Sequence, residues 1–192
     1  CVEIDQFACE TLRWNIASRK ESSSVFETDI RRLSPEDLAK DLDLKKGNLS
    51  LLFGGPPCQS FSLAGKQQGL SDDRGPLLFE IIRFAKHLEP SVILLEQVKG
   101  LLSAKDDNGK KGGVFESFLS QIEDAGYIAK WRVVLAADFG VPQLRERVFV
   151  VATRGHNGFF FPERTHAPLE ECNGLFSSLP YKNVGDAIQG LD

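Results

Sequence analysis

Methionine is absent from this sequence, and the residues that mark metal sites or disulfide scaffolds are few. The 192 residues include three histidines and four cysteines, at positions 1, 9, 58 and 172. The cysteines form no CxxC pair, and no metal-ligand spacing links them to the histidines. We therefore expect no metal and no disulfide framework, but reduced thiols in a cytoplasmic compartment.

Long apolar runs are also missing. No stretch is long enough to span a bilayer, and no charged-then-apolar leader opens the chain, so we expect no membrane partner. Hydrophobic residues make up 42% of the chain and charged residues 26%, which is ordinary for a globular domain. The formal net charge of −4 gives no general attraction to polyanions, so any polyanion site must be local.

The lack of an initiator methionine bears on how the chain is organised. It opens at Cys1 inside an apolar patch that resembles the middle of a strand. This pattern indicates a piece of a longer protein, and the alternative is a processed chain with an unusual start.

Strand-like and helix-like patterns alternate along the chain. Such alternation is typical of an α/β fold with helices on the faces of a parallel sheet. Ser34, Pro35 and the acids that follow predict a helix start. The first expected helix, residues 6–16, should turn Phe7, Leu12 and Trp14 inward. The expected strands cover residues 1–4, 24–27, 49–53, 92–95, 127–136 and 147–153, and the expected helices cover 6–16, 35–42, 75–87 and 114–124.

The most informative segment is residues 54–62, GGPPCQSFS. It ends an apolar run that reads as a buried strand, and it places Cys58 just beyond the carboxyl end of that strand. Ligands of open α/β sheets bind at such ends, and a thiol there is oriented and partly exposed. The alternative is a small buried cysteine in an ordinary loop.

Two further polar groups lie where strands meet loops. Glu96 directly follows an apolar run, and alternation places Gln143, Arg145 and Arg147 on one face. Glu96 could instead pair with Lys99, and the arginines could be exposed charges on an edge strand. Taken together with Cys58, these residues form a candidate site with a nucleophile, a proton handler and an anion clamp.

At this point the order of the motifs resembles that of the C5-cytosine-specific DNA methyltransferase family. The resemblance rests on residues 54–62, the triplet 96–98 and residues 143–147, and it covers nearly the whole chain. It implies a Rossmann-like sheet of the class I S-adenosylmethionine-dependent methyltransferases, with its first strand missing. Further matches to the family are residues 73–79, 137–142, and the cofactor segments 2–5 and 28–30.

The resemblance implies a mechanism. Cys58 would add to C6 of a cytosine flipped out of DNA, and C5 would then take a methyl group from S-adenosylmethionine. Glu96 would hydrogen-bond or protonate N3, Arg147 would lie near the base, and Arg145 would support it or contact a phosphate. The long loop after Cys58 would close over the base.

The resemblance also implies binding residues. Glu3 would take the ribose hydroxyls of the cofactor, Asp29 would contact the adenine amino group, and Pro57 and Leu77 would line the adenosine pocket or the methyl path. The remaining implied cofactor residues are Ile4 and Ile30, and the implied substrate residues are Gln59, Ser60, Phe61, Ser62 and Gln143.

The sequence departs from the family pattern in three ways. Gln97 stands where the family usually has Asn, the glycine-rich first motif is absent, and the target-recognition region is missing. We therefore expect residues 1–168 to be a partial catalytic domain and 169–192 to begin the connection to that region. Residues 1–192 alone should be unstable, bind the cofactor poorly and lack activity, because strands 1–4 and 49–53 would keep unpaired edges.

Other functions remain open from the sequence. The same pocket would serve a tRNA cytosine C5 methyltransferase, a catalytically inactive homologue would bind DNA or protein, and a split enzyme would take the missing strand from a second chain. For the enzyme we expect double-stranded DNA as partner, a cognate restriction endonuclease in the same system, and association with the nucleoid in a bacterium.

Overall fold

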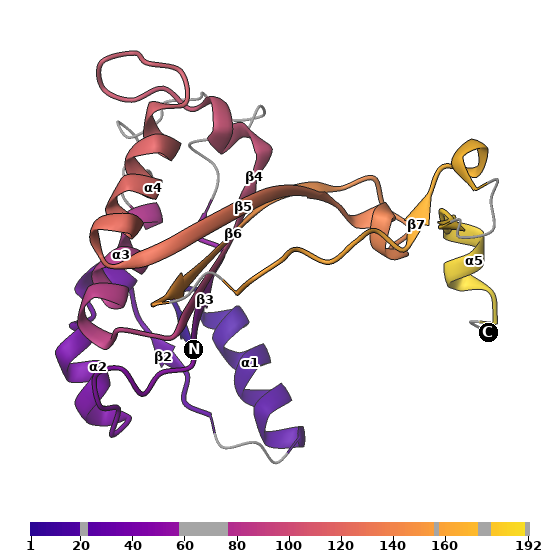
Figure 1. Ribbon diagram of the computed structural model, residues 1–192. Coiled ribbons are helices and arrows are strands. Elements are labelled where there is room, and N and C mark those ends of the chain that lie inside the picture. Colours follow the sequence, from indigo (N-terminus) through magenta and orange to yellow (C-terminus); the bar gives the residue numbers. More distant parts are fainter. Residues whose placement is uncertain (20–22, 58–76, 156–157, 173–177, 191–192) are drawn as a thin grey trace.

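The computed structural model describes residues 1–19, 23–57, 77–155, 158–172 and 178–190. Its main sheet has four strands in the order β3-β4-β6-β5 (Figure 1). β3 and β4 run parallel, whereas β6 runs antiparallel to both of its neighbours. The strands are β3 (Leu51–Gly54), β4 (Val92–Val98), β5 (Tyr127–Leu135) and β6 (Glu146–Arg154).

The α/β class is confirmed, but the expectation of a wholly parallel sheet is wrong. β5 connects to β6 through residues 136–145, which contain only the short 3-10 helix η4 (Ala136–Phe139). Parallel neighbours need a crossover of about a dozen residues or more, usually a helix. The short connection therefore returns the chain antiparallel, and the sheet is mixed.

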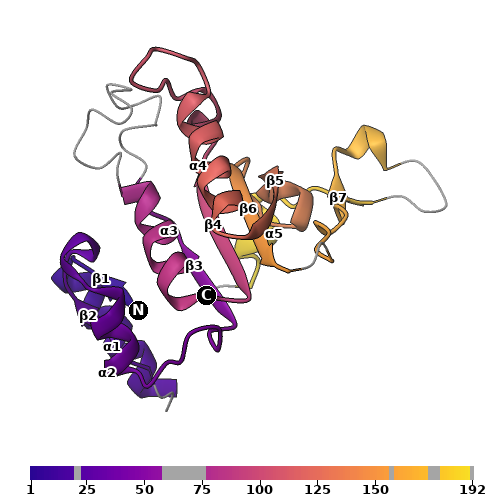
Figure 2. The same ribbon diagram turned by 60° about the vertical axis from the view of Figure 1, so that its left-hand side comes forward.

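Two helices cover one face of this sheet. α3 (Leu77–Leu88) and α4 (Gly113–Asp124) pack their apolar sides onto the alternate residues of β4 and β6 that point toward them. Figure 2 shows both helices side by side along the strands. The resulting core includes Leu78, Ile82, Ala85, Ile93, Leu95, Val114, Phe118, Ile122, Val148 and Val150.

The opposite face is crossed by residues 159–162, which we call the strap. Lys130 Nζ donates to the main-chain oxygen of Phe159 at 2.7 Å, and Arg132 Nη1 donates to that of Pro162 at 3.2 Å. Between the strap and the sheet lies an apolar groove of about 400 Å³, lined among others by Leu94, Phe149 and Phe161. The residues after Arg154 show no helical or strand periodicity, so neither the strap nor the groove was predicted.

A second, two-stranded parallel sheet pairs β1 (Val2–Glu3) with β2 (Phe26–Glu27). The chain then forms the 3-10 helix η1 (Ile30–Arg32) and the helix α2 (Pro35–Asp41). The predicted start of α2 is confirmed, because Ser34 caps it by accepting from Asp37 N at 3.2 Å. Arg83 of α3 donates to the main-chain oxygens of Ile30 and Leu33, which fixes this part of the chain to the main sheet.

Helix α1 (Gln6–Arg19) packs against β1 and β2, but on a different side from the one expected. Phe7 is 75% exposed and Trp14 is 70% exposed, so the inward placement of both is wrong. The inner stripe is Cys9, which is fully buried, with Leu12 partly buried three residues later. A single apolar stripe of a helix is narrow, and both aromatics lie on the side opposite Cys9.

The carboxyl-terminal part forms a small lobe away from the sheets (Figure 1). The His166 ring packs on Gly140, where a Cβ atom would come within 2.7 Å of it, and Tyr181 OH donates to Asp138 Oδ1 at 2.5 Å. These contacts join the lobe to η4. Its elements are β7 (His166–Ala167), the 3-10 helix η5 (Leu169–Glu171), β8 (Leu179–Pro180) and α5 (Val184–Ile188).

The two sheets leave open edges. In the described part of the chain, β1 pairs only with β2, and β3 pairs only with β4. Phe53 of β3 is 71% exposed, so the prediction of a fully buried strand at 49–53 is wrong. An open strand edge beside apolar side chains is a template for association.

We expect residues 1–192 expressed alone to self-associate through this edge. Phe53→Lys removes an apolar side chain worth about 1.5–3 kcal/mol of burial and should raise the concentration at which association begins about tenfold or more. Sedimentation velocity measures this, and Leu169→Lys, which adds the same charge in the distant lobe, should have no such effect. A monodisperse chain with a cooperative melt would contradict the prediction.

Candidate active site

The carboxyl ends of β3 and β4 meet the amino end of β6 at one edge of the main sheet. Because β6 is antiparallel to β4, Arg147 pairs in register with Val98, and Phe149 pairs with Glu96. Glu96 therefore lies inside β4, two residues before its end, and not at the end of the strand as predicted. The register places Glu96 and Arg147 diagonally on the same face.

Glu96 and Arg147 form an ion pair across the two strands. Arg147 Nε lies 2.9 Å from Glu96 Oε1, and Arg145 Nη2 lies 3.8 Å from the same oxygen. The side chains of Glu96 and Arg147 remain 37% and 23% exposed, so the pair contributes only about 0–1 kcal/mol to stability. Its geometry matters more for a ligand than for the fold.

The alternative partner for Glu96 was Lys99, and the structure pairs Lys99 differently. Lys99 Nζ donates to both carboxylate oxygens of Glu146 at 2.9 Å. Lys99 begins the 3-10 helix η3 (Lys99–Ser103), and Glu146 begins β6. This second pair across the same strand ends was not predicted, because only the pairing of β4 with β6 brings the two residues together.

The turn that leads to Cys58 passes directly beside Glu96. A Cβ atom built on Gly55 would lie 3.4 Å from Glu96 Oε2. Thus Oε1 of Glu96 faces the arginines, and Oε2 faces the turn. Cys58 itself and the predicted substrate residues 59–62 lie outside the described residues.

Gln97 fixes that turn to β4. Its side chain is buried, with 1% of the residue exposed. The amide Nε2 donates to the main-chain oxygen of Pro56 at 2.9 Å, and Oε1 accepts from Val98 N at 2.8 Å. The glutamine therefore makes a hydrogen bond to the segment before Cys58, although the family usually has Asn here.

The arginine segment is less regular than predicted. β6 begins at Glu146, so Gln143 and Arg145 precede it, and strand alternation does not apply to them. Arg145 N donates to the main-chain oxygen of Gln143 at 2.9 Å, and Ala136 N donates to that of Arg145 at 2.9 Å. The connection nevertheless brings Arg145 to the same oxygen of Glu96 as Arg147, while Gln143 is exposed.

The predicted cofactor residues Glu3 and Asp29 lie at the carboxyl ends of β1 and β2. Glu3 Oε1 accepts from the main-chain nitrogens of Ile4 and Asp5, at 2.7 and 2.9 Å. Asp29 caps η1 and accepts from Arg31 N and Nε, at 2.9 and 3.0 Å. The hydrogen bonds from Arg31 hold the pKa of the Asp29 carboxyl at about 2.

The other predicted cofactor residues differ in their surroundings. Ile4 is largely exposed, whereas Ile30 packs against the small cluster of Leu38, Phe84 and Leu88. Pro57 is the last described residue before Cys58, and Leu77 begins α3. The described residues contain no group of three His, Cys, Asp or Glu side chains suited to a metal, and none of their helices is long and apolar enough to cross a membrane.

Replacing Gln97 by Leu should destabilise the full protein by about 1–3 kcal/mol, because it leaves the Pro56 carbonyl and the Val98 amide without their side-chain partner. Denaturant unfolding measures the change. Gln121→Leu, the same substitution on the surface of α4, should shift stability by no more than about 0.5 kcal/mol. Equal effects of the two variants would contradict the role of Gln97.

Asp29 offers a test by pH. Its pKa lies below the ordinary value of 3.8 in the folded protein, so its contribution to stability is complete above that value and is lost as the pH falls through about 2. Arg31→Gln should raise the pKa of Asp29 back toward 3.8, as followed by carboxyl NMR. Lys40→Gln should leave it unchanged, and an unaltered pKa in Arg31→Gln would refute the assignment.

Comparisons with known proteins identify the family of the chain. A family profile described as C-5 cytosine-specific DNA methylase matches residues 1–182. The type II methyltransferase M.AquIA of Picosynechococcus sp. is 39% identical, over 99% of this chain and 78% of its own. M.NgoFVII of Neisseria gonorrhoeae is 38% identical, over 98% of this chain and 46% of its own.

Solved structures show the same fold. A prophage-encoded E. coli protein described as a DNA modification methyltransferase aligns over the whole chain and 47% of its own, with a TM-score of 0.70 and 25% identity. DNMT2 of Spodoptera frugiperda aligns over 85% of this chain and 44% of its own, with a TM-score of 0.59 and 24% identity. The chain thus spans about half the length of most of these relatives. On the profile match and the type II relatives, it belongs to the C-5 cytosine-specific DNA methylases.

Proposed function

We propose that the protein methylates C5 of cytosine in double-stranded DNA, through a covalent bond between Cys58 and C6 of a flipped base. The observation that carries this proposal is the divided carboxylate of Glu96. One oxygen pairs with Arg147 at 2.9 Å, and the other faces the turn that leads to Cys58. A base placed at that turn would meet the thiol and the carboxyl group together.

S-adenosylmethionine is the methyl donor of this family, and it supplies an electrophilic methyl group when bound. The donor set fits it. Glu3 is the last residue of the parallel strand β1, and its Oε1 accepts hydrogen bonds from the turn that follows. A carboxylate at such a strand end suits the two hydroxyls of a ribose. We assign the ribose to Glu3 and the adenine side to Asp29, with Ile4, Ile30, Pro57 and Leu77 around the adenosine.

Cys58 begins the chemistry as a thiolate. It forms a bond to C6, the C5–C6 π bond breaks, and its electron pair makes C5 nucleophilic. After C5 has taken the methyl group, a base removes the C5 proton, the double bond re-forms, and the thiolate leaves. The target carbon lies inside the base stack, so the cytosine must first be extruded from the duplex.

Glu96 and the arginines stabilise the charge that builds on the ring. Glu96 hydrogen-bonds or protonates N3, so that electron density moved onto the ring by the thiolate is accommodated there. Arg147 holds the carboxyl group in place, and Arg145 supports it or contacts a phosphate. We place Gln59, Ser60, Phe61, Ser62 and Gln143 near the substrate.

DNA is the substrate that the relatives favour, because they are named as type II methyltransferases and the family description specifies DNA. A type II modification enzyme acts beside a restriction endonuclease, and we expect one in the same system. A methylation assay with DNA and tRNA side by side tests the substrate. Methyl transfer to tRNA alone would overturn the choice of DNA.

The covalent step is tested by trapping. A pool of random-sequence duplexes carrying 5-fluorocytosine, with S-adenosylmethionine, should give a stable adduct with the full protein, because the fluorine at C5 blocks the release step. Cys58→Ser should abolish the adduct, and Cys172→Ser should keep it. Adduct formation by Cys58→Ser, or none with the unaltered protein, would refute the mechanism.

A further inference from the structure

A short turn between η3 and α4 holds two lysines side by side. We call residues 104–112 the lysine turn. Asp106 N donates to the main-chain oxygen of Lys110 at 3.2 Å, and Gly112 N donates to that of Ala104 at 3.0 Å. Lys105 and Lys111 form an antiparallel bridge between these two hydrogen bonds.

The hydrogen-bond pattern fixes how close the two lysines are. Lys105 and Lys111 face each other between the two hydrogen bonds and are not hydrogen-bonded to each other through their main chains. In such a pair the Cα atoms lie about 4.5 Å apart and the side chains stand close together on one face. Like charges directly opposite one another destabilise a strand pair. The backbone thus places the two like-charged side chains next to each other, and both residues are exposed.

Two other charged residues of the turn, Lys110 and Asp106, have partners of their own. Lys110 Nζ is bound to Glu116 of α4. Asp106 Oδ1 accepts from the main-chain nitrogens of Asn108 and Lys110, at 3.0 and 2.9 Å. Asp107 is the remaining acid. No ion pair to Lys105 or Lys111 occurs among the side chains that the structure describes.

The lysine turn lies at the same end of the molecule as the candidate active site. It follows β4 and η3, and Figures 1 and 2 show it as the loop that extends furthest beyond the carboxyl end of β4. The chain has a net charge of −4, so its attraction to a polyanion must come from local clusters such as this one.

We propose that the lysine turn clamps one backbone phosphate of the DNA duplex between Lys105 and Lys111. A phosphate has the negative charge that relieves the repulsion between the lysines. Because the Asp106 hydrogen bonds already fix the backbone of the turn, binding costs little further conformational entropy. The clamp rests on the proposed function, since it needs DNA at this end of the sheet. It contacts no base and adds affinity without sequence preference.

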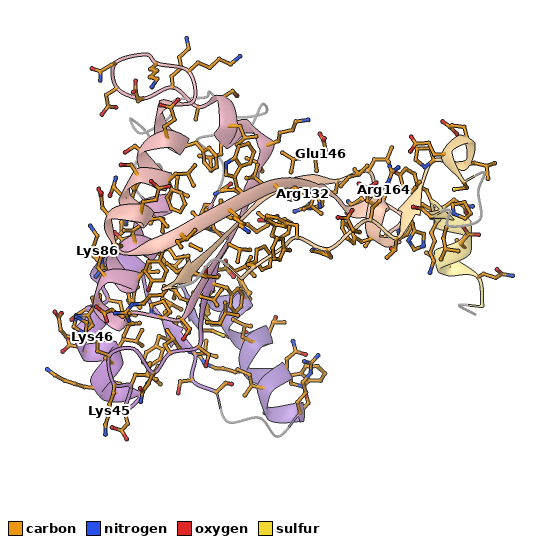
Figure 3. All side chains as sticks on the ribbon, viewed as in Figure 1. Lys45, Lys46, Lys86, Arg132, Glu146 and Arg164 are labelled. Atoms are coloured by element: carbon orange, nitrogen blue, oxygen red, sulfur yellow. The ribbon has the colours of Figure 1, made fainter. Side chains whose placement is uncertain are left out.

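The test is the salt dependence of duplex binding by the full protein. K105Q/K111Q should weaken binding to random-sequence duplexes and reduce the slope of log K against log salt by about 0.9, the value for one phosphate. K45Q/K86Q removes the same charge at two exposed positions below the lysine turn in Figure 3, and should leave the slope unchanged. An unchanged slope in K105Q/K111Q, or an equal loss in both variants, would overturn the clamp.

Two controls distinguish binding of DNA from binding of free phosphate, and the clamp from the proposed function. Inorganic phosphate should compete no better than chloride at equal ionic strength, and a specific effect of phosphate that K105Q/K111Q abolishes would overturn the assignment to DNA. The 5-fluorocytosine adduct is measured on the same variant and should still form. The adduct reports on the proposed function and the slope on the clamp, so either can fail without the other.

Discussion

The antiparallel pairing of β6 with β4 is the constraint on which the candidate active site depends. It sets Val98 opposite Arg147 and thereby brings the start of one strand to the end of another. A shift by one residue would turn Arg147 toward the helices and Val148 toward the ligand side, because neighbouring side chains point to opposite faces. The apolar residues of β6 that pack under α3 and α4 prevent such a shift. The geometry of the candidate site is therefore fixed by the burial of side chains several residues away.

Adjacent residues of β4 serve opposite purposes. Glu96 points to the open face and meets the arginines, whereas Gln97 points into the core and ties down the turn before Cys58. A buried amide with both of its polar ends satisfied adds rigidity without leaving an unpaired group. Two adjacent residues of β4 thus hold the turn before Cys58 and carry the Glu96 carboxylate.

The sequence predicted the elements of the fold well wherever apolar runs were bounded by clear breaks. The start of α2 at Ser34 and Pro35 was found because its capping chemistry is local. The direction of β6 was missed because strand polarity depends on the length and path of a connection, and a local residue pattern carries neither. Phe7 and Trp14 were misplaced because a large apolar residue was assumed to be buried, and the inner side of α1 is instead formed around Cys9. The convergence of Glu96 and Arg147 was expected from their motifs, while the pair of Lys99 and Glu146 depends on tertiary placement alone.

The strap across the open face of the sheet is held by hydrogen bonds to its main chain, which do not depend on which side chains it carries. Lys130 and Arg132 bind main-chain oxygens of the strap, and every residue type offers that acceptor. Substitutions at 159–162 would thus change the wall of the apolar groove while the crossing itself stays in place. The groove could therefore be reshaped by substitutions in the strap, as long as Lys130 and Arg132 keep their hydrogen bonds to its main chain.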